Sequence, residues 1–484
     1  MSLSSTAWIV FSMLCMSPVY HASHEHLLSL RHAFMAPDRG HLVRPRAGGN
    51  TLTLKGGSDQ SSQKVNCNMV MVGHVDAGKS TISGHLLYSF GQLDDRTLDK
   101  FTKESTAMGR ASWKFAWAMD LTAEEREKGK THEVGQAYFE SENRKYTLLD
   151  APGHRGYVPS MIAGAALAEV AVLIISARTG EFEAGFEKGG QTREHAILIR
   201  STGVRHLIVA VNKMDECSWS KERYDDIVGK LQPFFKSIGY GLSEVVFLPL
   251  DGLHGVNLKS RMGPDVCSWY DGPSLIEALD TVKLVKSQPS LPVRFQVSCA
   301  YRETDVYLLG KLECGVIRAG EELLLLPDNS VITITQIFFE STSVEESSAG
   351  DILRLKVKGC TEDVPAGSIL SPSKGVGRAK ATRCIEVKVN ILDCKSIIAA
   401  GYSCMFHCHS IATDCTWESV ISVIDKQLGE VKRPFVRRGQ SAVLRLEFSS
   451  EICVETYKDF SQLGRFVLRE DGLTIGIGIV LNLL

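Results

Sequence analysis

The stretch GHVDAGKS, residues 73–80, follows the apolar run 67–72 and precedes a segment of helical character at 80–90. A strand, a glycine-rich turn and a helix in this order predict a phosphate-binding loop, whose backbone N–H groups point at phosphate oxygens. Lys79 is expected to reach the β- and γ-phosphates, and Ser80 is expected to offer its hydroxyl to Mg²⁺. The residues expected to hold the nucleotide here are Gly73, His74, Val75, Asp76, Ala77, Gly78, Lys79, Ser80 and Thr81.

A second motif, DAPGH at 150–154, follows the strand-like run 146–149. Asp150 is suited to hold a water on Mg²⁺, and the Gly153 N–H is suited to meet the γ-phosphate. His154 is then expected beside the place of the attacking water, where an imidazole can orient that water, so it is the catalytic candidate. The alternative is a turn histidine with no role in the reaction.

A third motif, NKMD at 212–215, follows the apolar run 207–211. Asp215 can accept hydrogen bonds from both N1–H and the 2-amino group of guanine, while Asn212 braces the loop and Lys213 completes the binding set. Adenine has neither donor, and sites built on such bonds reject the analogue that lacks them by about 10⁴-fold or more. The three motifs together predict a GTPase rather than an ATPase, with GTP and Mg²⁺ bound.

The pattern of apolar runs predicts an α/β P-loop GTPase domain with a mostly parallel sheet, followed by two all-β barrel modules. Helices are expected at 192–201, 221–238 and 273–281, whereas short β-branched runs begin near Leu291 and break near 371–375. The expected divisions are 1–63 as an N-terminal leader or disordered extension, 64–286 as the GTP-binding domain, 291–372 as the first barrel module and 376–484 as the second.

Composition indicates a globular protein, with 484 residues, 44% apolar and 23% charged content. The net charge of −2 gives no overall attraction to nucleic acid. Thirteen cysteines without a CxxC pair favour free thiols in a reducing compartment, and so a cytoplasmic protein. The apolar run 7–16 is too short for a membrane span but long enough for a signal-peptide core, so an organelle-targeted or secretory route is the alternative.

Several longer runs resemble the translational GTPases of the elongation-factor one-alpha type, and more narrowly the eukaryotic release factor three branch. The runs are SWKFAWAMD at 112–120, EEREKGKTHEVGQAYFE at 124–140, ISARTGEFEAGFEKGGQTREHA at 175–196 and GRFVLRE at 464–470. The resemblance covers nearly everything from about 66 to 484. It implies that Thr131 coordinates Mg²⁺ and closes over the γ-phosphate, and Lys130 before it is typical of the release-factor branch.

The resemblance implies a GTPase that binds the stop-codon-recognising release factor and couples GTP hydrolysis on the ribosome to chain termination. Gly464, Arg465 and Phe466 match the family's partner-binding motif; without that match, a strand with an exposed arginine is the simpler interpretation. Two other functions stay open, delivery of aminoacyl-tRNA and ribosome rescue. Residues 291–484 hold 22 Lys and Arg against 24 Asp and Glu, a balance that disfavours direct tRNA binding.

One residue departs from the family in the loop expected to complete the guanine pocket, formed by Asp251, Gly252 and Leu253. The family normally has Ser in place of Asp251. A carboxylate there would repel Asp215. Either Asp251 turns to solvent and leaves the N–H groups of Gly252 and Leu253 to meet the guanine oxygen, or the pocket is weakened by about 1 kcal/mol, the scale of one hydrogen bond.

Overall fold

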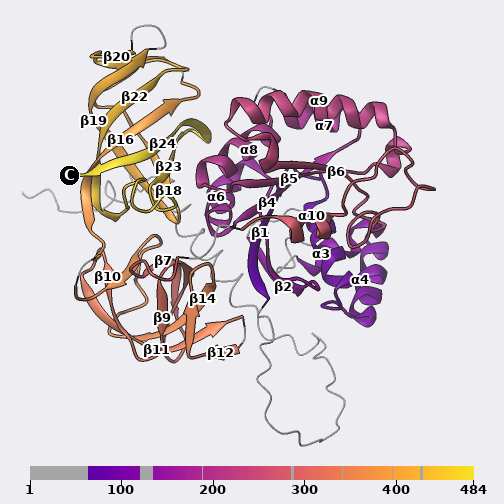
Figure 1. Ribbon diagram of the computed structural model, residues 1–484, viewed down its shortest axis with the longest axis horizontal. Helices are drawn as coiled ribbons and strands as arrows, with labels where there is room; N and C mark the ends of the chain where they lie inside the picture. The colour runs from indigo at the N-terminus through magenta and orange to yellow at the C-terminus, as the bar shows by residue number, and fades with distance from the viewer. Residues whose placement is uncertain are drawn as a thin grey trace, which may run out of the picture.

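The computed structural model describes residues 64–119, 134–187, 189–284, 288–340, 342–375, 377–394, 396–425 and 429–484. These residues form an α/β module and two β-barrels that stack on each other along one side of it (Figure 1). The expected α/β module with a mostly parallel sheet, followed by two all-β barrels, is therefore confirmed. None of the described helices is long and apolar enough to span a membrane.

The α/β module is built on a six-stranded sheet with the order β2-β3-β1-β4-β5-β6. Only β2 is antiparallel to its neighbour among these strands. The strands are β1 (Val65–Gly73), β2 (Gly135–Glu140), β3 (Arg144–Asp150), β4 (Val170–Ser176), β5 (His206–Asn212) and β6 (Val245–Pro249). The carboxyl ends of β1, β3, β5 and β6 therefore meet along one edge, where parallel sheets place their ligand sites.

Helices cover both faces of this sheet. The helices are α3 (Lys79–Ser89), α4 (Asp95–Ala107), α6 (Val158–Leu167), α7 (Glu181–Phe186), α8 (Gln191–Thr202), α9 (Lys221–Ser237) and α10 (Leu275–Thr281). Side chains of β1 alternate between two apolar clusters, Val70 and Val72 on the side of α6, α8 and α9, and Met69 and Met71 on the side of α3 and α10. The three helices expected from the sequence correspond to α8, α9 and α10. Single 3₁₀ turns are η1 (Ala111–Lys114), η2 (Ala116–Ala118), η3 (Arg155–Tyr157), η4 (Asp215–Cys217) and η5 (Leu242–Glu244).

Each barrel closes because a strand at one end of its strand order pairs with a strand near the other end. The first closes through β10 and β11, and the second through β18 and β19. The first contains β7 (Arg294–Arg302), β8 (Val306–Cys314), β9 (Val316–Arg318), β10 (Glu322–Leu326), β11 (Ser330–Phe339), β12 (Thr342–Val344), β13 (Glu346–Ser348), β14 (Ile352–Lys358) and β15 (Ile369–Pro372). The second contains β16 (Ala381–Ile391), β17 (Ile398–Ala399), β18 (Ser403–Cys408), β19 (Ile411–Asp425), β20 (Gly429–Val431), β21 (Phe435–Val436), β22 (Ser441–Cys453), β23 (Arg465–Glu470) and β24 (Leu473–Leu483).

The two barrels are joined by a buried ion pair and an apolar cluster. Arg294 Nε lies 2.6 Å from Glu455 Oε1, and Gln296 donates to the Ser410 hydroxyl at 2.6 Å. The cluster at this seam contains residues of both barrels, Leu324, Leu326, Ile369, Ala379, Cys453 and Leu463.

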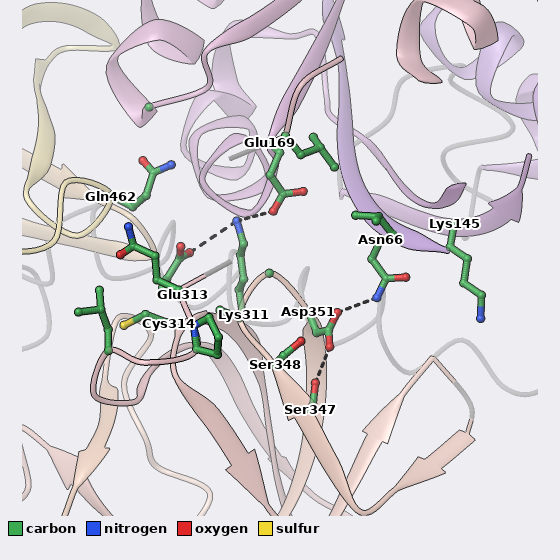
Figure 2. Close-up of a pocket in the computed structure, with 18 of the residues that line it drawn as sticks. Asn66, Lys145, Glu169, Lys311, Glu313, Cys314, Ser347, Ser348, Asp351 and Gln462 are labelled. Atoms are coloured by element: carbon green, nitrogen blue, oxygen red, sulfur yellow. Dashed lines mark hydrogen bonds and ion pairs between the residues drawn. The ribbon is translucent and has the colours of Figure 1, made fainter. Parts of the chain in front are cut away.

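The α/β module contacts both barrels. Asn66 donates to Asp351 of the first barrel at 2.7 Å. The Lys311 ammonium of β8 lies 3.2 Å from a Glu169 oxygen and 3.7 Å from a Glu313 oxygen. Figure 2 shows these contacts around a cavity of about 1280 Å³ lined by all three modules. No residue of the phosphate loop lines this cavity, so it is a space between modules and separate from the sheet edge described above.

Candidate nucleotide-binding site

The GHVDAGKS segment forms the turn between β1 and α3, as expected. Gly78 has φ 101°, which a side chain would strain, and a Cβ there would lie 2.3 Å from Asn212 Nδ2. The Lys79 ammonium donates to the His74 carbonyl at 2.8 Å and is almost fully buried. Burial lowers the pKa of Lys79, while the charges of Asp150 and Asp76 act in the opposite sense. The loop is thus wound tightly around one buried cation.

The end of β3 lies against this loop. Asp150 is fully buried, and its charge acts on Lys79. A Cβ at Gly153 would lie 2.5 Å from Lys79 Nζ and 3.1 Å from Val75 N, so only glycine fits this approach. The second motif therefore reaches the phosphate loop through Asp150 and Gly153, the two residues assigned to Mg²⁺ and to the γ-phosphate.

His154 lies on the surface just beyond these residues. Its side chain caps η3, where Nδ1 accepts a hydrogen bond from the Gly156 N–H at 3.1 Å. Because Nδ1 is the acceptor, the proton of the neutral ring is assigned to Nε2. The imidazole is exposed in this arrangement, and its distance from a bound nucleotide depends on rotation about its side chain.

The NKMD segment joins the phosphate loop to the loop after β6. Asn212 Nδ2 donates to the Ala77 carbonyl at 2.8 Å, and Asn212 Oδ1 accepts from the Gly252 N–H at 2.8 Å. This is the bracing expected of Asn212. The Lys213 ammonium lies 2.8 Å from a Glu181 oxygen.

Asp215 carries a buried oxygen, Oδ1, that receives no hydrogen bond from the residues the structure describes. Burial, and then the charge of Asp251, raise the pKa of the Asp215 carboxyl. A buried carboxylate oxygen requires a donor. The N1–H and 2-amino groups of guanine are donors of the required kind.

The loop at Asp251 differs from expectation. Asp251 is 3% exposed, so the alternative in which it turns to solvent is wrong, and the alternative of a weakened pocket stays a prediction. Its Oδ1 accepts from the N–H groups of Leu253 at 2.9 Å and His254 at 3.2 Å. The Gly252 N–H is engaged by Asn212, so neither N–H group expected to meet the guanine oxygen is free. An aspartate side chain is short enough to accept hydrogen bonds from N–H groups two and three residues ahead in its own turn, so Asp251 holds this loop in a closed turn.

The Gly464–Phe466 triplet begins β23 at the junction of the second barrel with the α/β module. Phe466 is 1% exposed and stacks on Phe406 inside the barrel, so in this arrangement its ring faces the barrel core. Arg465 is half-buried and donates to the Tyr457 hydroxyl at 3.0 Å. Burial lowers the pKa of Arg465. The simpler interpretation, an exposed arginine, does not hold.

Two features of the site could not be found from sequence motifs. The His254 imidazole lies 2.5 Å from Asp251 Oδ2, and only its spacing of three residues hinted at the contact. Glu194 of α8 lies 3.3 Å from Arg469 of β23, a contact between segments far apart in the chain. Thr131 and Lys130, and the leader 1–63, lie outside the described residues.

Two family models agree with the fold and the phosphate loop and indicate a GTP-binding protein. Residues 64–285 match the family model of the elongation factor Tu GTP binding domain, and residues 384–481 match the GTP-eEF1A C-terminal domain-like family. The chain therefore carries an elongation factor Tu type GTP-binding domain in residues 64–285 and a GTP-eEF1A C-terminal domain-like module in residues 384–481.

The chain is similar to proteins named eukaryotic peptide chain release factor GTP-binding subunit. It is 42% identical over 428 residues to that of Schizosaccharomyces pombe, which covers 87% of this chain and 64% of the relative. For Kluyveromyces lactis the identity is 42% over 434 residues, or 88% of this chain and 62% of the relative. The chain thus spans under two thirds of the length of these relatives.

A solved structure supports the fold alone. The Saccharomyces cerevisiae Ski7 GTPase-like domain, bound to GTP, matches with a TM-score of 0.71 at 20% identity, over 86% of this chain and 97% of that one.

Proposed function

We propose that this chain is a translational GTPase that binds the stop-codon-recognising release factor and couples GTP hydrolysis on the ribosome to polypeptide chain termination. The observation that carries the nucleotide choice is the buried Asp215 oxygen, which has no donor among the residues that the structure describes. The names of the relatives at 42% identity support the role in termination. Their names alone do not assign a partner, so the partner is part of the proposal.

The chain's own residues act on GTP by position and charge, because phosphoryl transfer requires little covalent chemistry from the protein. The phosphate-loop residues 73–81 bind the phosphates, with Lys79 neutralising charge. Asn212, Lys213 and Asp215 hold the base, and the loop of Asp251, Gly252 and Leu253 forms the wall beside it. His154 orients the attacking water after its ring turns from the surface toward the Gly153 N–H.

Mg²⁺ fits the oxygen donors at the phosphate loop. Ser80 and Thr131 would hold the ion, and the buried Asp150 carboxylate would hold one of its waters. Hydroxyl, carboxylate and water oxygens are the hard ligands that Mg²⁺ prefers. When bound, the ion neutralises charge that develops on the phosphate oxygens.

The partner assignment rests on the second barrel. In the arrangement described here, Arg465 is the member of the triplet that retains partial exposure, and Gly464 fits closely against Tyr457, with a Cβ position 2.5 Å from the Tyr457 N. We propose Arg465 as the contact and Gly464 and Phe466 as the residues that shape its strand. Arg465→Ala should then weaken binding to the release factor while GTP binding is unchanged.

A pull-down from cell extract tests the proposal, with the GTP-loaded chain as bait and the GDP-loaded chain as matched control. Recovery of the stop-codon release factor supports the proposal. Recovery of aminoacyl-tRNA instead would assign the chain to delivery, and recovery of a different tRNA-shaped factor would assign it to ribosome rescue. Recovery of none of these with a GTP-loaded bait would overturn the partner assignment.

We place this activity in the cytoplasm, where the proposed partners act. The apolar run in the leader keeps the organelle or secretory route as the alternative. A fluorescent fusion at the carboxyl end separates the two routes, because the leader stays free in such a fusion.

A further inference from the structure

The loop that follows β6 brings two acidic side chains and one histidine into contact beside the guanine pocket. Carboxylate oxygens of Asp215 and Asp251 and a ring nitrogen of His254 all lie within 4.8 Å of one another. Asp251 is buried, whereas the His254 side chain is 65% exposed. The histidine therefore covers the acidic pair from the solvent side.

The two carboxylates have different partners. Asp251 accepts from two N–H groups of its own loop and from the His254 ring. Asp215 has the buried oxygen that lacks a donor among the described residues. The charge of Asp251 raises the pKa of Asp215, and the charge of His254 acts in the opposite sense, although burial is the largest cause. Asp215 must stay ionised to accept two hydrogen bonds from guanine, so the charge state of its neighbours affects binding.

We infer that His254 is a positioning residue for guanine recognition, whose protonated imidazole balances the Asp251 carboxylate and makes guanine-nucleotide affinity depend on pH. The inference rests on the proposed guanine site. The sign of the pH effect on affinity follows from charge. When His254 is neutral, the negative charges of Asp215 and Asp251 both face the guanine edge that carries the oxygen, and neither is compensated. With charged His254, one of them is compensated, and the base binds more tightly.

Other charged groups near the loop do not supply this charge. His85 of α3 lies 3.0 Å from the Gly252 carbonyl, and burial is the largest cause that lowers its pKa, which disfavours its charged form. Lys114 of η1 lies over the Phe115 ring at 4.9 Å. Glu216 is bound to Arg178. Histidine is the side-chain type whose charge ordinarily changes between pH 5 and 8, so His254 is the member of this cluster that the test addresses.

Calorimetric titration of the full chain with GDP and Mg²⁺, from pH 5.5 to 8.5, tests the inference. We expect the affinity to rise by about fivefold as pH falls from 8.5 to 6, the effect of one unit charge at about 4 Å in a water-like dielectric. Binding near neutral pH should also take up a fraction of a proton, seen as a heat that depends on the ionisation enthalpy of the buffer. A merely structural role for His254 would produce neither signal.

Three variants provide the controls. His254→Gln, at an exposed position, should bind GDP with a flat pH profile at the level of the wild type at high pH. His254→Lys, with a charge that persists to pH 8.5, should be flat at the higher level, and Asp251→Asn should also lose the pH dependence. Parallel profiles for the wild type and His254→Gln would overturn the inference while leaving the guanine site intact. Failure of the guanine site itself would look different, because ATP would then displace GDP at similar concentrations.

Discussion

At the scale of single residues, the choice of base depends on the Asp215 carboxylate. One of its oxygens is buried and has no donor among the described residues, while Asn212 and Gly252 fix the walls around it. A base with two hydrogen-bond donors on one edge can donate to both oxygens of the Asp215 carboxylate at once. The proposed function assigns the choice between guanine and adenine to this one side chain.

Asp215→Asn should lower GDP affinity by about 10²-fold or more, because hydrogen bonds to a charged group contribute about 1.5–3 kcal/mol each. The amide can donate to the 2-carbonyl of xanthine, so the variant should bind xanthosine diphosphate more tightly than GDP. Displacement of labelled GDP measures both effects, with Glu216→Gln as the neighbouring control. An unchanged preference for GDP would remove Asp215 from the base site.

His154→Ala should leave GDP binding nearly unchanged and slow ribosome-stimulated hydrolysis by about 10²-fold or more, the usual size of a proton-transfer or water-orienting contribution. Single-turnover hydrolysis on ribosomes is the measurement. His154→Ser keeps a short acceptor for the Gly156 N–H, so it separates the stability of the turn from the action on water. Normal hydrolysis in both variants would assign His154 to the turn alone.

At the scale of elements, β23 has two different faces. Phe466 and Leu468 point into the second barrel, whereas Val467 packs with the core of the α/β module and Arg469 lies 3.3 Å from Glu194 of α8. Alternation along a strand produces this division. One face of β23 thus belongs to the core of its barrel, and the other face packs against α8.

Phe466→Ala should destabilise the second barrel by about 3–5 kcal/mol, because it removes a buried ring from a packed core. Denaturant unfolding followed by far-ultraviolet circular dichroism measures the loss. Phe466→Leu should cost much less. Loss of partner binding in the Ala variant without loss of stability would show that the ring acts outside the barrel, against the packing described here.

Three features could be predicted from the sequence: the phosphate loop, the approach of Asp150 and Gly153 to that loop, and the bracing by Asn212. Each depends on residues that are adjacent in sequence at the end of a strand. The closed loop at Asp251 and the faces of β23 could not. Asp251 finds its partners within its own turn and at Asp215, and the outward face of β23 is covered by α8, 275 residues away at the Arg469–Glu194 contact. Such contacts leave no periodic pattern in the sequence.

At the scale of the whole molecule, a buried charge cluster joins the α/β module to the first barrel. Lys311 is shared by Glu169 and Glu313, and one ammonium cannot fully compensate two carboxylates. Burial raises the pKa of Glu313, although Lys311 acts against this. The pKa of Lys311 is raised by the two carboxylates against the effect of burial, so the lysine stays charged.

Glu313→Gln should therefore raise the thermal midpoint at pH 8 by a few degrees, since Lys311 keeps Glu169 and a buried charge is removed. The folded-state pKa of Glu313 lies above its unfolded value of about 4.3. Protonation of Glu313 therefore stabilises the folded state fully below that value, and this stabilisation is lost as pH rises through the raised pKa of Glu313. The advantage of the variant should thus vanish near pH 4. Thermal unfolding across this range measures it, and an advantage that is equal at every pH would contradict the cluster's role.

The seam between the two barrels limits how many shapes the chain can adopt. If the barrels were independent, each junction with the α/β module could open or close separately, and four arrangements would be populated. Since Arg294, Glu455 and the cluster around Leu463 fix one barrel to the other, a rotation that frees α8 from β23 also pulls Glu169 from Lys311. We therefore expect the two barrels to move together relative to the α/β module, and a pair of distance probes on the α/β module and either barrel should report the same single transition.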